Sequence, residues 1–106
     1  MSTTEAHIAP DGTIVFNGRL DALEAPTMRA LFQGRIADGH THLVADLSDC
    51  SFIDSAALAA LVSALKAVRE RGGELTLVSP RSTDAHRVFE LTHFDKVFTM
   101  LAPSAP

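Results

Sequence analysis

The pair Asp54-Ser55 is the part of this sequence best suited to chemistry. It ends the run Asp46-Leu-Ser-Asp-Cys-Ser-Phe-Ile53 and precedes the apolar segment that begins at Ala56. A hydroxyl at the start of a helix lies beside backbone N–H groups without intrahelical partners and beside the positive end of the helix dipole. There Ser55 can cap the helix, a role open to Asp54 as well, or it can carry a phosphate that these groups stabilise. We therefore expect any chemistry of this chain to occur at Ser55.

Hydrophobic periodicity predicts the elements that position this pair. Residues 41–47 form a short apolar run, which is typical of a buried central strand, and a polar loop containing Cys50 follows it up to Asp54. From Ala56 onward, apolar residues recur at helical spacing as far as Val68. Gly72-Gly73 ends this predicted helix. The pair thus lies between a strand and a helix.

The other elements complete an alternating pattern. Asp11-Gly12 lies between two short apolar runs and predicts an antiparallel hairpin. The predicted strands cover residues 7–9, 13–17, 41–47, 74–78 and 96–101, and the predicted helices cover residues 25–33 with an end between 34 and 39, 56 to the Gly72-Gly73 pair, and 83–91. This order predicts an α/β fold with a mixed four- to five-stranded sheet, helices packed mainly on one face and right-handed crossovers.

Length and composition are those of one globular domain. The chain has 106 residues, of which 46% are hydrophobic and 21% charged, and folding at this length buries about two thirds of the surface of the unfolded chain. We expect a single domain over residues 1–106 with its core at about 5–101. Because the chain has neither a long uncharged apolar run nor a recognisable signal peptide, we expect a cytoplasmic protein without membrane insertion. The single Cys50 cannot form an internal disulfide, in agreement with that compartment.

Several function classes are disfavoured. A net charge of −4 and the lack of clustered Lys and Arg argue against direct nucleic-acid binding. The five His residues are not at metal-ligand spacing, so no metal and no cofactor is predicted. A hydrolase using Ser55 and His86 would lack the Gly-x-Ser-x-Gly elbow, so we predict that the protein is not an enzyme. Protein partners or small ligands remain.

A series of short motifs resembles the STAS domain family, which includes bacterial anti-sigma factor antagonists and the cytoplasmic ends of sulphate transporters. The resemblance runs from about residue 12 to residue 100. Within the family, the chain is most similar to stand-alone antagonists, which are regulators of transcription. The motifs that carry it, in chain order, are Gly18-Arg-Leu-Asp21, Asp46-Leu47, Ser51-Phe-Ile-Asp-Ser-Ala-Ala-Leu58, Gly72-Gly-Glu-Leu-Thr-Leu-Val78 and Val88-Phe-Glu-Leu-Thr92 before Phe94.

This resemblance implies a partner-switching role controlled by phosphorylation of Ser55. In antagonists, the serine after the Asp of the Asp-Ser motif is phosphorylated by an anti-sigma factor that is also a serine kinase. The unphosphorylated antagonist binds that anti-sigma factor and frees the sigma factor, and the phosphorylated form does not bind until a phosphatase restores it. Asp21 matches an acidic position that supports kinase recognition. The partner-binding residues implied in this chain are Asp21, Asp54, Ser55, Ala56, Ala57 and Leu58.

One departure from the family pattern concerns kinase access. Antagonists commonly follow Asp-Ser with Ser or Thr and then Gly, whereas this chain has Ala56 and Ala57. The additional methyl group of Ala57 can hinder a kinase that approaches closely. A second interpretation is therefore an accessory STAS subunit of a lipid-transport ATP-binding cassette complex, and the neighbouring genes would distinguish the two roles.

The expected effect of a phosphate on Ser55 is electrostatic. Four carboxylates lie near Ser55 in the sequence or in the inferred fold, and we expect them to form an acidic patch with it. A phosphate adds about −1.5 to −2 charges, which would make a partner surface shaped for a neutral hydroxyl unfavourable. The four residues are Asp21, Asp46, Asp49 and Asp54.

Overall fold

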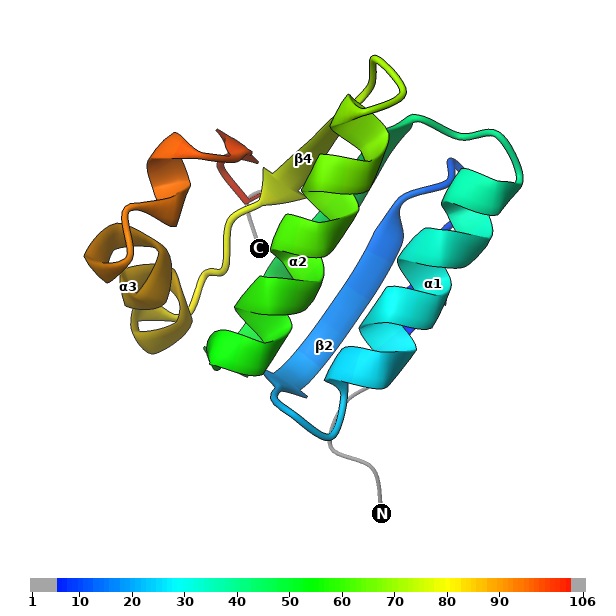
Figure 1. The fold of residues 1–106 in the computed structure, drawn as a ribbon. Coiled ribbons are helices and arrows are strands. Elements are labelled where there is room, and N and C mark those ends of the chain that lie inside the picture. The colour runs from blue at the N-terminus through cyan, green and yellow to red at the C-terminus, as the bar shows by residue number, and fades with distance from the viewer. Residues whose placement is uncertain (1–5, 104–106) are drawn as a thin grey trace.

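Residues 6–103 of the computed structural model form a five-stranded mixed sheet with three α-helices (Figure 1). The strands lie in chain order across the sheet, with β1 antiparallel to β2 and the other neighbours parallel. The predicted α/β class and mixed sheet are confirmed. The elements are β1 (Ala6–Ile8), β2 (Ile14–Leu20), α1 (Ala25–Ala37), β3 (His42–Ile53), α2 (Ser55–Arg69), β4 (Glu74–Val78), α3 (Thr83–Leu91), a 3₁₀ turn η1 (Phe94–Lys96) and β5 (Thr99–Leu101).

The core lies between the sheet and the helices α1 and α2, which run side by side across one face (Figure 1). One row of strand residues, Ile14, Ala45 and Leu77, is in register across β2, β3 and β4, and each is fully buried. On α2 the buried positions include small alanines, which allow the helix to approach its neighbours closely. No helix within the described residues is long and apolar enough to cross a membrane.

The prediction of a polar loop between residue 47 and Asp54 is wrong, because β3 continues to Ile53. Its partner β2 also continues past the predicted end, and the two strands stay paired as far as Leu20 and Ile53. Two register shifts in this pairing place extra residues in β3, as β-bulges do. The polar side chains of Asp49 and Ser51 therefore face solvent while Cys50 and Ile53 are buried.

The last predicted strand is too long, because only Thr99–Leu101 pairs with β4. The residues before it form the turn η1, in which the amides of Val97 and Phe98 donate to the carbonyl of Phe94. The Phe98 ring also packs edge-on against Phe94 and Phe89, with ring centroids 6.3 and 6.4 Å away. This aromatic cluster favours a turn where the hydrophobic pattern alone suggested a strand.

Cys50 lies in β3 rather than in a loop, and its thiol is inaccessible. The side chain is 1% exposed, and its Sγ lies 3.5 Å from the carbonyl oxygen of Phe16, to which the thiol donates. Burial, with the nearby carboxylates of Asp46 and Asp49, raises the pKa of the Cys50 thiol to about 12. Since the thiolate is the reactive form, we expect no labelling of the native protein by a thiol reagent at neutral pH and full labelling in guanidinium. Rapid labelling of the native protein would contradict this burial.

Candidate functional site

The Asp54 carboxylate joins three segments at one end of the sheet. Its Oδ1 accepts from the amides of Ala56 and Ala57, at 2.9 and 3.1 Å, which makes Asp54 the N-cap of α2. Its Oδ2 accepts from the amide of Ala22, at 3.1 Å, in the loop between β2 and α1. The Asp54 amide donates to the carbonyl of Leu20 at the end of β2. Of the two possible caps in the sequence, Asp54 and not Ser55 is the cap.

Ser55 is the first residue of α2, and its side chain is exposed. No group within residues 6–103 forms a hydrogen bond with its hydroxyl. Since Asp54 already occupies the amides of Ala56 and Ala57, a phosphate on Ser55 would interact with the helix dipole but not with these two donors. The expectation that these amides would stabilise a phosphate on Ser55 is therefore corrected. The hydroxyl is free to meet a partner.

Asp21 lies in the loop that Asp54 holds. Its Oδ1 accepts from the amide of Leu23 at 3.1 Å, and its carbonyl accepts from the amides of Glu24 and Ala25 at 3.0 Å. These bonds shape the turn into α1. Because the next residue, Ala22, donates to Asp54, the structure brings the Asp21 loop and the start of α2 together. The side chain of Leu23 is 85% exposed on this loop.

The side chains of Ala57 and Leu58 point inward. Ala57 is 0% and Leu58 5% exposed, whereas Ala56 is partly exposed. The methyl group of Ala57 therefore adds nothing to the surface at which a partner would approach Ser55. Among the implied partner-binding residues, Ala57 can act only through the shape that it gives to the first turn of α2. Leu58 is nearly buried but lines the apolar hollow beside Ser55.

The acidic patch at Ser55 contains fewer than the four carboxylates that the sequence predicts. Asp46 lies nine residues before Ser55, most of them in an extended strand, so the two are more than about 20 Å apart. Asp49 is paired with Arg81, with Nη1 and Oδ1 2.7 Å apart. Asp54 is adjacent to Ser55, and Asp21 lies in the neighbouring loop, where its Oδ2 is 4.0 Å from Nε of Arg19. Within the described part of the chain, no three His, Cys, Asp or Glu side chains are placed to hold a metal ion.

An open apolar groove of about 510 Å³ begins at Ser55. Its floor is α2, and its other side includes Thr92 and Phe94 from the segment after α3. No local pattern in the sequence predicts this groove, because its two sides come from α2 and from the segment after α3, which are far apart along the chain. We call it the Ser55 groove, and the residues that define it are Ser55, Leu58, Ala59, Val62, Ser63, Thr92 and Phe94.

Comparisons with known proteins agree with this arrangement. A family model described as the STAS domain matches residues 4–104. A candidate anti-sigma factor antagonist from Thermotoga maritima is 27% identical, with 94% of this chain and 86% of that chain covered and a TM-score of 0.77. An anti-sigma factor antagonist from Mycobacterium paratuberculosis is 29% identical, with 96% of this chain and 86% of that chain covered and a TM-score of 0.75. The Bacillus cell fate determinant SpoIIAA in its phosphorylated form shares the fold at 20% identity, with 95% and 91% covered and a TM-score of 0.70.

Proposed function

This chain belongs to the STAS domain family, and from that premise we propose that it is an anti-sigma factor antagonist that acts by partner switching. The observation that carries the proposal is the exposed hydroxyl of Ser55, which has no partner within residues 6–103 and directly follows the capping residue Asp54. The two neighbours above 25% identity named above are described as a candidate antagonist and an antagonist, which favours this role over the accessory subunit of a lipid-transport complex.

In the proposed cycle, the unphosphorylated protein binds an anti-sigma factor in the cytoplasm and frees the sigma factor. The anti-sigma factor acts as a kinase and transfers the γ-phosphoryl group of ATP to Oγ of Ser55, releasing ADP and the hydroxyl proton. A phosphatase hydrolyses the phosphate ester and restores the hydroxyl. The protein itself is the substrate in both steps and not a catalyst.

The phosphate is proposed to act on the partner rather than on this fold. Asp54 keeps its bonds to Ala22, Ala56 and Ala57, so the added charge need not displace any of them. The charge therefore stays at the surface beside Asp54 and Asp21. An interface that formed over the neutral hydroxyl would have to desolvate a dianion, which costs several kcal/mol. Since each 1.4 kcal/mol is a factor of about ten in affinity, this is enough to dissociate the complex.

Phosphosite mapping tests the proposal. The protein is incubated with its cognate anti-sigma factor kinase and Mg-ATP and then digested for peptide mass spectrometry. We expect phosphate on Ser55, no phosphate in Ser55→Ala, and unchanged phosphorylation in Thr99→Ala, which removes an exposed hydroxyl on β5. Phosphate at another residue, or none from a kinase shown to be active on ATP, would count against the proposal.

The Ala57→Gly variant tests whether the departure from the family pattern matters. We expect the free energy of unfolding to fall by about 1 kcal/mol or more, because Gly is unfavourable in a helix and a buried methyl group is lost. The rate of Ser55 phosphorylation should stay unchanged, because that methyl group is not on the surface. Urea denaturation and phosphorylation kinetics check the two parts. Clearly faster phosphorylation of Ala57→Gly would show that the methyl group does obstruct the kinase.

A further inference from the structure

The Ser55 groove continues along α2 toward its C-terminus. A second apolar hollow of about 440 Å³ is lined by Val62, Leu65, Lys66, Arg69, Glu70 and Val97. Val62 lines both hollows, so the two lie next to each other along α2, and we call them together the channel. The opposite side of the channel is formed by residues 92–97, which we call the outer wall. The outer wall lies between α3 and β5 and contains η1.

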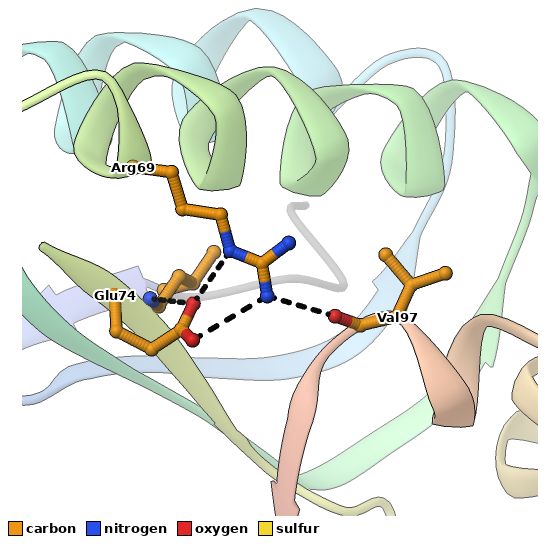
Figure 2. Close-up of polar contacts among 4 residues, drawn as sticks. Arg69, Glu74 and Val97 are labelled. Carbon is orange, nitrogen blue, oxygen red and sulfur yellow. Dashed lines mark hydrogen bonds and ion pairs between the residues drawn. The ribbon is translucent and has the colours of Figure 1, made fainter. Parts of the chain in front are cut away.

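Arg69 ties the outer wall to α2. Its Nε donates to Oε1 of Glu74 at 3.1 Å, and its Nη2 donates to Oε2 of Glu74 at 3.4 Å and to the carbonyl of Val97 at 3.1 Å (Figure 2). The guanidinium group lies between α2, the start of β4 and the end of the outer wall. Its hydrogen bond also holds the pKa of Glu74 below the ordinary value of that carboxyl. One side chain thus joins three elements.

The outer wall has conformational features that work against its own stability. His93 has a φ of 60°, in the left-handed region that a non-glycine residue rarely adopts. Oδ1 of Asp95 is buried and has no hydrogen-bond partner within residues 6–103, which is unfavourable. Val97 is 40% exposed. The wall has internal bonds of its own, in which the amides of Lys96 and Val97 donate to the carbonyls of His93 and Phe94. The bond from Arg69 to the carbonyl of Val97 is the hydrogen bond that joins the wall to α2 within residues 6–103.

We propose that Arg69 is a positioning residue for partner recognition, holding the outer wall so that apolar side chains of the anti-sigma factor enter the channel beginning at Ser55. This rests on the proposed function, because a partner that covers Ser55 and the first turn of α2 reaches the channel directly. The far end carries Lys66, an exposed cation with no ion pair within residues 6–103. The complementary surface is an apolar stripe with an acidic residue opposite Lys66.

The test is the affinity of the cognate anti-sigma factor kinase for the wild-type protein, for four variants and for one control variant. Arg69→Met keeps an apolar stem but removes the guanidinium, and we expect an affinity loss of about tenfold, because binding must then order the wall. Arg69→Lys should recover part of this loss. Val62→Glu, which places a charge in the channel, and Lys66→Glu should also weaken binding. The matched control Arg71→Met removes a cation just beyond the same helix and should bind like wild type.

Amide hydrogen exchange gives a readout that does not need the partner. In Arg69→Met we expect faster exchange in residues 92–97 than in wild type, and no such change in Arg71→Met. If wild type binds the kinase and Arg69→Met or Val62→Glu binds equally well, the inference is overturned while the proposed function stands. Equal losses of affinity in Arg69→Met and Arg71→Met would show that the effect comes from net charge alone. That result would also overturn the inference. If wild type does not bind the kinase at all, the proposed function fails first.

Discussion

Ser55→Asp is expected to weaken binding to the anti-sigma factor kinase by about a hundredfold or more, whereas Ser55→Ala should bind like wild type. The Ser55 hydroxyl has no partner within residues 6–103, so alanine removes no internal bond. Aspartate instead brings a carboxylate to a surface that the partner must desolvate. A hundredfold loss corresponds to about 2.7 kcal/mol, which is within the unfavourable free energy of burying an unpaired charge. Isothermal titration calorimetry measures both affinities.

A matched control separates this local effect from net charge. Ala37→Asp adds the same charge at the exposed last residue of α1, which lies about 20 Å along that helix from its start. We expect Ala37→Asp to bind within a factor of about two of wild type, because a charge at that distance is screened. If Ser55→Asp and Ser55→Ala bind equally well, the switch is not at Ser55.

Asp54→Ala is expected to lower the free energy of unfolding by about 2–3 kcal/mol. The variant removes the cap on the amides of Ala56 and Ala57 and also leaves the amide of Ala22 without its acceptor. Asp54→Asn should recover part of the loss, since Asn is an equally good N-cap but offers one oxygen instead of two. Urea denaturation gives the free energies, and the amide chemical shift of Ala22 reports the lost bond to the loop.

The control for this variant is Asp49→Ala in β3, the strand that precedes Asp54. Asp49 is exposed and paired only at the surface with Arg81, and such pairs contribute about 0–1 kcal/mol. If Asp54→Ala and Asp49→Ala lower the free energy of unfolding equally, the claim that Asp54 both caps α2 and holds the loop at Ala22 would be wrong. A normal stability of Asp54→Ala with an unchanged Ala22 amide shift would contradict it as well.

The elements best predicted from the sequence were those with a strong local pattern. The helical period from Leu58 to Val68 and the turn at Asp11-Gly12 each correspond to an observed element, α2 and the hairpin of β1 and β2. The end of β3 was not predictable in this way. Asp49 and Ser51 look like loop residues. They lie in a strand because β2 pairs with Asp49, Cys50 and Phe52, which leaves Ser51 as the extra residue of a register shift.

The candidate site was partly predictable. Asp54 and Ser55 were identified from their types and position, but either can cap a helix, so only the geometry assigns the cap to Asp54. The bond from Asp54 to Ala22 spans 32 residues of sequence, and no local pattern predicts it. The inward orientation of Ala57 depends on how α2 is rotated against the sheet. The outer wall of the channel was missed for the same reason, because its residues meet α2 only in the folded chain.

The most direct measurement is the release of the sigma factor from its complex with the anti-sigma factor. The protein is added to that complex either unphosphorylated or fully phosphorylated at Ser55, and the free sigma factor is quantified by size-exclusion chromatography. We predict that the unphosphorylated protein releases the sigma factor, that the phosphorylated protein does not, and that phosphatase treatment restores release. Equal release by the two forms, or no release by either, would contradict the account.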